Sequence, residues 1–185
     1  MFAQANDILI RNAEAGDAAR LAAWWNDGKV MAHAGFPLGL GISAEEIVQK
    51  LARDSDDTVR RLILEYQHKP IGEMSFRRLE QDTAEIGIKI CEAAYQNRGI
   101  GRIALSLLIR SLFDRGVQKI VLDTNPANTR AQHVYQLLGF SLYRTRKDCW
   151  TDQLGRLQSA VDGELTRDRF HDFSLAREND AGPLD

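Results

Sequence analysis

The sequence predicts an α/β fold in which a mixed central β-sheet of about seven strands is flanked by about four helices. The first observation is the element order, which reads as strand, two helices, three strands, helix, strand, helix and two strands. The second is the strand-helix-strand unit of residues 84–123, which must be a right-handed crossover between parallel strands. The three strands that end in this unit form an antiparallel meander, so the sheet is mixed.

The first half of the chain supplies a strand, two helices and the meander. An apolar run at residues 8–11 predicts the first strand, and apolar residues recurring after Asp17 predict a helix that Asp17 caps. Ser43 and Glu46 have the spacing of a capping box, which starts a second helix that ends near residue 53. Strands with alternating polarity follow at residues 61–66, 71–79 and 84–91.

The second half alternates helices and strands. Residues 99–113 are hydrophobic around most of the helical circumference, which is typical of a helix buried against a sheet. The remaining elements are a strand at residues 117–123, a helix at residues 128–138 and two long strands at residues 140–149 and 158–168. We expect one domain over residues 1–172, followed by a polar tail of residues 173–185 that is disordered.

Composition excludes several classes of function. The 185 residues fit one domain, and a net charge of -2 gives no basic footprint for nucleic acid. No apolar stretch approaches the roughly 18 residues of a membrane span, and residues 1–10 lack the basic segment followed by an apolar run that is typical of a signal peptide. We therefore expect a cytoplasmic location without a membrane partner. Cys91 and Cys149 read as free thiols, and no His/Cys cluster has the spacing of metal ligands, so no metal is expected.

The segment Gln-Asn-Arg-Gly-Ile-Gly at residues 96–101 carries the functional signal, because it joins a strand to the apolar helix. A helix N-terminus presents unpaired backbone N–H groups and a partial positive charge, and glycine lets an anion approach the backbone closely. The segment is therefore suited to holding phosphate. Its glycine spacing is neither that of a Rossmann fingerprint nor that of a P-loop.

This segment resembles the pyrophosphate-binding motif of the GNAT acetyltransferases, with Gln96, Gly99 and Gly101 at the motif positions. A second segment of that family is matched downstream by Asn128, Ala131, Tyr135, Gly139 and Phe140. On a helix, Asn128 and Tyr135 differ by only about 20° around the axis, so a thin pantetheine arm could lie along this face. Trp25–Asp27 and the hairpin at Trp150–Gln158 further resemble the subgroup that includes ribosomal-protein N-terminal acetyltransferases.

The resemblance implies an acetyl-CoA-dependent N-acetyltransferase in which the acceptor amine attacks the thioester directly. The residues that it implies for acetyl-CoA binding are Ile88, Ile90, Gln96, Asn97, Arg98, Gly99, Ile100, Gly101, Arg102, Asn128, Ala131 and Tyr135. The distance from Ile90 to Gln96 is one residue longer than in many relatives, which predicts a bulge or a longer turn before the loop.

Three carboxylates are candidates for the base that removes the amine proton. Glu85 is placed first, at the start of the strand leading to the loop; Asp123, which closes the neighbouring parallel strand, is second, and Glu73 is third. Tyr135 is the candidate proton donor to the leaving sulfur, because a reference pKa of about 10 keeps it protonated at neutral pH. The backbone N–H of Ile90 is the candidate support for the developing oxyanion.

Several alternatives stay open at this point. The chain could be a CoA-binding regulatory domain without catalysis, or it could use another acyl donor. The amine acceptor could be a protein N-terminus, an amino acid, a polyamine or an aminoglycoside. His33 could border the acceptor pocket, whereas His133 projects about 160° away from Tyr135 on its helix. Relatives often dimerise, so a homodimer is a further option.

Overall fold

The computed structural model describes residues 2–80 and 82–175. Within these residues, one mixed sheet contains eight strands in the order β1-β2-β3-β4-β5-β6-β8-β7. The strands are β1 (Phe2–Ala5), β2 (Ile8–Asn12), β3 (Val59–Tyr66), β4 (Lys69–Arg78), β5 (Thr83–Ile90), β6 (Lys119–Thr124), β7 (Ser141–Thr151) and β8 (Leu157–Thr166). The predicted mixed sheet is confirmed, with β1 as an additional strand that pairs with β2.

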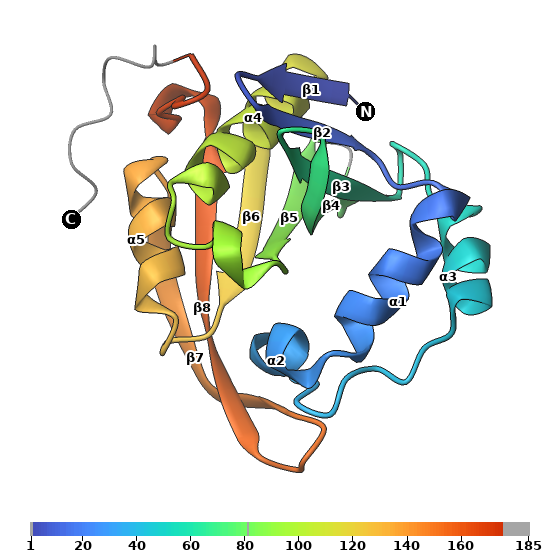
Figure 1. Cartoon of the computed structure of the whole chain (residues 1–185). Coiled ribbons are helices and arrows are strands. Elements are labelled where there is room, and N and C mark those ends of the chain that lie inside the picture. The colour runs from blue at the N-terminus through green and yellow to red at the C-terminus, as the bar shows by residue number, and fades with distance from the viewer. Residues whose placement is uncertain (1, 81, 176–185) are drawn as a thin grey trace.

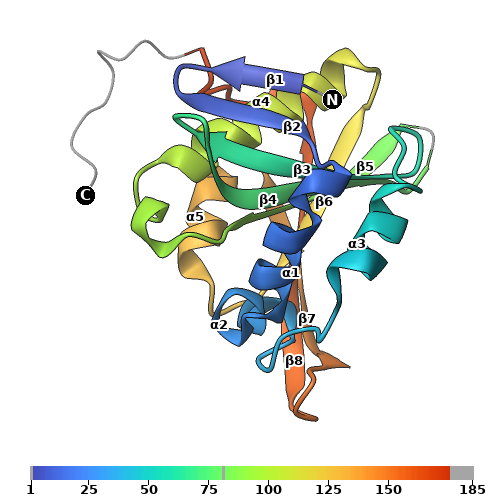
Figure 2. The same cartoon turned by 45° about the vertical axis from the view of Figure 1, so that its right-hand side comes forward.

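The helices divide between the two faces of the sheet (Figures 1 and 2). They are α1 (Ala18–Asn26), α2 (Gly28–Met31), α3 (Ala44–Leu51), α4 (Ile100–Asp114) and α5 (Thr129–Leu137). Helices α4 and α5 cover one face, where Leu107, Leu108 and Ile109 are fully buried in the main core. Helices α1 and α3 cover part of the other face through a smaller core around Leu21 and Ile47.

Strands β5 and β6 are parallel, as the crossover predicts, but they stay together only over their first residues. Their register begins at Thr83 opposite Lys119 and ends at Glu85 opposite Val121. Beyond that point β5 remains paired with β4 as far as Ile90, while β6 remains paired with β8. The sheet therefore splits between β5 and β6 toward their carboxyl ends (Figure 1).

Of the two predicted helix N-caps, the one at Ser43 is confirmed and the one at Asp17 is wrong. Ser43 and Glu46 form the reciprocal capping box at the start of α3. Asp17 stands at the N-cap of α1 without a side-chain cap bond, because its carboxylate accepts hydrogen bonds from the Arg11 guanidinium at 2.7 Å and from the Glu14 backbone at 2.8 Å. The Arg11 hydrogen bond also lowers the pKa of Asp17.

The end of the described chain packs along α4. The backbone N–H of Phe173 donates to Ser106 Oγ at 3.0 Å, and the guanidinium of Arg102 lies 4.4 Å from the centre of the Phe173 ring. Ser174 is buried. The rest of the predicted disordered tail, residues 176–185, lies outside the described residues.

Candidate active site

The α4 entry loop, residues 96–101, leads into a 15-residue helix whose N-cap is Gly99. Asn97 and Gly99 have positive φ values of 59° and 72°, which turn successive N–H groups toward one side. No described residue accepts a hydrogen bond from the amides of residues 97–101, whereas the N–H groups of Arg102 and Ile103 both reach Gly99 O. Free amides at a helix N-terminus are suited to binding an anion.

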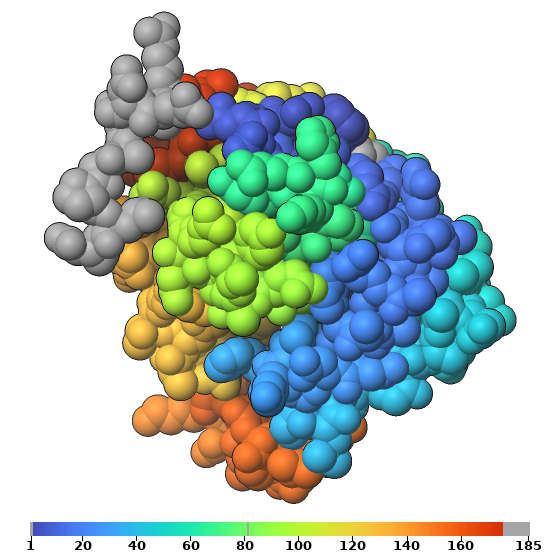
Figure 3. Space-filling model, viewed as in Figure 1, coloured from blue at the N-terminus to red at the C-terminus, as the bar shows by residue number. Residues whose placement is uncertain are grey.

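Gln96 holds this loop in place. Its amide nitrogen donates to the carbonyl oxygen of Ile90 at 2.8 Å, which ties the loop to the end of β5. The longer spacing expected from the sequence is taken up by a single 3-10 turn, Ala93–Tyr95, and by the amides of Cys91 and Glu92, which both donate to Ile71 O. The loop lies at the surface beside α5, as the yellow-green and gold atoms of Figure 3 show.

The backbone of β5 faces the split in the sheet at Ile88 and Ile90. The Cys91 amide donates to Ile71 O on β4. Hydrogen-bonded positions alternate along an antiparallel ladder, so the polar backbone groups of Ile90 and Ile88 point away from β4. They face the side where β6 has already separated from β5. This edge can hydrogen-bond an extended ligand.

Helix α5 borders the other side of the split. The side chain of Asn128 caps this helix by accepting from the Ala131 amide at 3.2 Å, and Ala131 is half-buried against the main core. Tyr135 is 9% exposed, and its ring centre lies 5.7 Å from that of Phe140. Burial, together with the nearby charge of Asp123, raises the pKa of Tyr135 to about 12. His133 is exposed.

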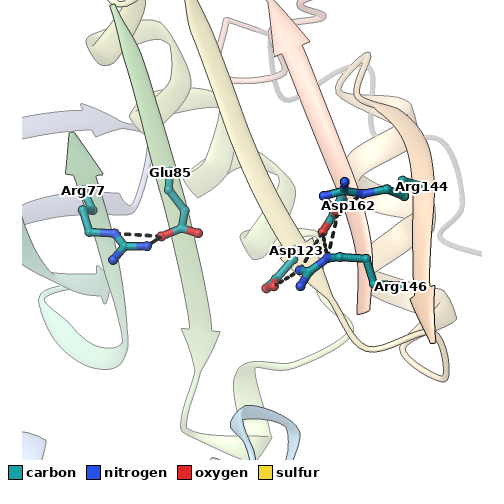
Figure 4. Close-up of polar contacts among 6 residues, drawn as sticks. All are labelled: Arg77, Glu85, Asp123, Arg144, Arg146 and Asp162. Atoms are coloured by element: carbon teal, nitrogen blue, oxygen red, sulfur yellow. Dashed lines mark hydrogen bonds and ion pairs between the residues drawn. The ribbon is translucent and has the colours of Figure 1, made fainter. Parts of the chain in front are cut away.

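Glu85 and Asp123 occupy the two strands that separate, and each is held by an arginine (Figure 4). Glu85 Oε2 accepts from Arg77 Nη2 at 2.7 Å, and Asp123 Oδ2 accepts from Arg146 Nη2 at 3.1 Å. Partial removal from solvent raises the pKa of Asp123, and the charges of Glu85 and Asp162 act in the same direction against that of Arg146. The sequence predicts a functional role for both carboxylates but for neither arginine.

Asp162 on β8 is a further member of this group that the sequence analysis missed. It lies directly opposite Asp123 in the β6–β8 register and is 7% exposed. Its carboxylate accepts from Arg144 Nε at 2.7 Å and from Arg146 Nη2 at 2.8 Å. These hydrogen bonds, that of Arg146 first, lower the pKa of Asp162. Arg146 thereby bridges two carboxylates that would otherwise repel each other across the strands.

We call this group of six residues (Arg77, Glu85, Asp123, Arg144, Arg146 and Asp162) the charged cleft. A hollow of about 310 Å³ between β4, β5 and β6 is lined by Arg77, Glu85 and Asp123. A second hollow of about 310 Å³ shares Glu85 and Asp123 and extends to Arg144, Arg146 and Asp162. Ile86 and Leu122, the neighbours of Glu85 and Asp123, belong to the core that contains α4. Successive side chains of a strand point to opposite faces, so the charged cleft lies on the sheet face opposite α4.

Glu73 and Cys91 are both engaged elsewhere. The buried Glu73 carboxylate accepts from Trp25 Nε1 at 2.7 Å and from Lys89 Nζ at 2.8 Å, which anchors α1 to the sheet. Burial, followed by the charge of Glu73, raises the pKa of Cys91 to about 12, so its thiol stays protonated at neutral pH. Glu73 therefore fits a structural role better than that of a base.

A family model described as "Acetyltransferase (GNAT) domain" matches residues 7–141. The chain belongs to this family. No similar sequence is found among curated proteins. Among solved structures, the ribosomal-protein-alanine N-acetyltransferase of Brucella melitensis is 21% identical with a TM-score of 0.73, and the match covers 85% of this chain and 98% of that one.

Two further GNAT-like structures contain the cofactor. Spermidine N-acetyltransferase from Vibrio cholerae, in complex with CoA and spermine, is 21% identical with a TM-score of 0.77, over 88% of this chain and 97% of that one. An acetyltransferase from Salmonella typhimurium with its cofactor acetyl-CoA is 20% identical with a TM-score of 0.72, and the match covers 87% of this chain and 94% of that one. At this level of identity the likeness shows a shared fold.

The segments that resemble the ribosomal-protein subgroup build one wall of the GNAT domain. The Asn26 side chain exchanges two hydrogen bonds with the backbone of Ile42, and Asp27 caps α2. The β7–β8 hairpin rests on this region, because Gln153 bonds the backbone of Leu38 and Gly39 at 2.9 Å each. A Cβ atom on Gly35 would lie 2.4 Å from the Trp150 ring, so this contact requires glycine.

His33 is exposed and lines neither of the two hollows. Across residues 2–80 and 82–175, no three His, Cys, Asp or Glu side chains gather in a way that could hold a metal ion. Within the same residues, no helix combines the length and hydrophobicity needed to cross a membrane.

Proposed function

We propose that this GNAT domain transfers an acetyl group from acetyl-CoA to a primary amine by direct attack of the amine on the thioester. The observation that carries the proposal is the row of free amides at residues 97–101, which opens beside the split between β5 and β6. Such a row of amides is suited to binding a diphosphate. The split between β5 and β6 would let a narrow ligand extend from one face of the sheet to the other.

The residues around the split fit a coenzyme A molecule. The amides of the α4 entry loop would hold the diphosphate, with Arg98 and Arg102 adding positive charge, while Gln96 keeps the loop in position. The backbone of Ile88 would hydrogen-bond the pantetheine arm, with Asn128 and Ala131 along its other side, and the Ile90 amide would face the thioester. A Cβ on Gly101 would lie 3.5 Å from Ile90 Cδ1 and 4.0 Å from Ile88 Cδ1, so a larger side chain would press on this part of β5.

In the reaction, Tyr135 donates a proton to the leaving sulfur and a carboxylate of the charged cleft accepts the proton of the amine. Asp123 fits the base better than Glu85, which the sequence placed first. Its charge acts on Tyr135, and its raised pKa makes it the stronger base. Glu85 accepts two hydrogen bonds from Arg77, whereas Asp123 accepts one, at 3.1 Å, from Arg146. The Ile90 amide stabilises the oxyanion.

Single-turnover transfer tests this function. The protein is mixed with radiolabelled acetyl-CoA and a panel of primary amines, and acetylated amine is separated from CoA, while calorimetry measures CoA binding. We expect tight binding together with product formation. Binding without product from any amine would favour the alternative, a CoA-binding regulatory domain without catalysis. The absence of CoA binding would overturn both.

Two features expected from the sequence remain predictions. A cytoplasmic location agrees with the need for acetyl-CoA. A homodimer is expected from the resemblance to the family, and light scattering on the purified protein would measure it.

A further inference from the structure

We propose that the acceptor is an amine that also carries an anionic group, such as a carboxylate, and that Arg77 and Arg146 recognise this group. The inference rests on the proposed acetyl transfer and names its acceptor class. It starts from the charges of the charged cleft, where Glu85, Asp123 and Asp162 are matched by Arg77, Arg144 and Arg146. The cleft therefore offers no excess of negative charge to attract a polycation.

The position of these charges is informative because the carboxylates and the arginines occupy different places. Glu85 lies at the last paired position of β5 and β6, Asp123 lies two residues beyond its partner Val121, and both line the first hollow (Figure 4). The amine must meet the thioester beside this hollow, where the two strands separate. Arg77 lies outside Glu85, directly opposite it in the β4–β5 register, and Arg146 reaches Asp123 from β7. Each of these two carboxylates is thus paired with a guanidinium that lies farther from the split than the carboxylate does.

An entering ammonium group competes with these arginines for the same carboxylates. Arg77 places both of its hydrogen bonds on Glu85 Oε2, and its side chain is 56% exposed, so it can turn toward a ligand. A guanidinium that loses its carboxylate partner is left with water, and a charge-assisted hydrogen bond to another anion is stronger than one to water. An anionic group on the substrate supplies one, and every charge in the cleft stays paired.

The same exchange disfavours other amines to different degrees. An alkylamine leaves the released guanidinium with water alone, whereas a diamine brings a second positive charge against Arg77 or Arg146. The expected order of preference is therefore amines with an acidic tail, then amines with a neutral tail, then amines with a cationic tail. Arg146 is less free to turn, because Asp162 holds it as well.

Matched acceptors test this order. One series contains 4-aminobutyrate, butylamine and 1,4-diaminobutane, which share chain length and differ at the far end; the second contains the dipeptide amides Ala-Asp and Ala-Lys, which present an α-amine. The measured quantity is kcat/KM at saturating acetyl-CoA, from the release of free thiol. In at least one series we expect the acidic member to exceed the cationic member by about tenfold or more, and this ratio to fall as salt rises.

Variants show whether Arg77 causes the preference. Arg77→Gln should reduce the ratio by at least about fivefold and Arg77→Glu should reverse it, with unchanged affinity for CoA. The control is Arg167→Gln, in the 3-10 turn Arg167–Arg169, because Arg167 also forms an exposed ion pair, with Asp114, and neither residue lines a hollow. It should leave the ratio as in the wild type.

The outcomes separate this inference from the proposed function. If the cationic members match or exceed the acidic members in both series, the acceptor proposal is overturned while acetyl transfer stands. If no amine is acetylated although CoA binds, the proposed function fails and the acceptor proposal fails with it. Should the Arg77 variants not fold, the salt dependence of the wild-type ratio still decides.

Discussion

The two faces of the sheet contribute to the candidate site in different ways. On the α4 side, the groups that face a ligand are mostly backbone amides of the α4 entry loop and of β5, together with Tyr135. On the opposite side, the charged cleft consists of side chains from β4, β5, β6, β7 and β8. The α4 side is therefore suited to coenzyme A, the ligand that we expect to be shared by many proteins of the GNAT fold. The opposite side carries the features that can differ from one chain to the next.

This difference determines what mutation can change. A backbone amide is lost only when the chain path moves or when a side chain fills the space before it, so the α4 side is sensitive at Tyr135 and at Gly101. Each charge of the charged cleft can be removed singly, and its loss alters the pKa of its neighbours. Changes on the first face should affect the use of CoA, and changes on the second should affect the amine.

The largest effect is expected for Tyr135→Phe. The ring contact with Phe140 remains, so the fold is kept, but the thiolate leaves without a proton donor. We expect kcat to fall by about 10² to 10³ while CoA affinity changes little. Steady-state kinetics and calorimetry measure the two quantities. Tyr66→Phe, at the end of β3, is the control, and an unchanged kcat in Tyr135→Phe would exclude the acid role.

Gly101→Leu should reduce the affinity for acetyl-CoA about 100-fold, which corresponds to about 2.7 kcal/mol. The leucine would press on Ile90 and Ile88, whose Cδ1 atoms would lie 3.5 and 4.0 Å from its Cβ, and would displace the β5 edge or the entry loop that we propose holds the cofactor. Gly101→Ala should cost much less, because its Cβ would sit at an ordinary contact distance of 3.5 Å. Gly16→Leu is the control, since nothing lies within 4 Å of a Cβ there. Calorimetry gives each affinity, and equal affinities in both Gly101 variants would argue against the loop assignment.

The sequence predicts the α4 side better than the charged cleft, and the reason is physical. The residues of the entry loop are neighbours in the chain, and helix caps and turns form from such local groups. Arg144, Arg146 and Asp162 meet only through the register of β7 on β8, which shifts between Leu142 and Arg144 and again between Arg146 and Trp150. The alternation of polar and apolar residues along one strand does not predict where its register with the partner strand shifts.

The fold shows the same division. The capping box of α3 lies within four consecutive residues, and it was predicted from them. Strand β1 was missed because its four residues include only one large apolar side chain, Phe2, which is exposed. Asp17 was misread because Arg11, on the neighbouring strand, takes the carboxylate that would have capped α1.

The pH dependence of kcat/KM distinguishes the two carboxylates. A base is inactive when protonated, so activity falls as the pH drops through its pKa, and the raised pKa of Asp123 places this fall above the ordinary range of an Asp. Asp123→Asn should remove this acid limb and reduce kcat/KM about tenfold to 100-fold. Glu85→Gln removes a negative charge beside Asp123, which lowers its pKa and moves the limb to lower pH.

Arg146→Gln should move the limb the other way, because loss of the positive charge raises the pKa of Asp123. Each profile is recorded at saturating acetyl-CoA with one amine. If Glu85→Gln abolishes the limb and Asp123→Asn only shifts it, the base is Glu85, and the assignments must be exchanged.

The smallest effect is expected from Asp162→Asn, and it concerns stability. Because the folded-state pKa of Asp162 is lowered, its contribution is present above the unfolded pKa of about 3.9 and is lost as the pH falls through the folded value. Arg144 and Arg146 are 58% and 37% exposed at their side chains, so solvent screens the pairs. We therefore expect a loss of only about 1–2 kcal/mol in the free energy of unfolding at pH 7.

Denaturant unfolding of both proteins from pH 7 to pH 3 measures this difference, which should shrink as the pH decreases. Asp57→Asn, on an exposed turn, is the matched control and should leave the free energy of unfolding nearly unchanged. The variant also sharpens the contrast between the two faces. Arg146 without its Asp162 anchor should raise the KM for the amine, whereas the affinity for acetyl-CoA, which depends on the α4 side, should stay the same. A change in acetyl-CoA affinity would mean that the two faces are coupled through β6 and β8.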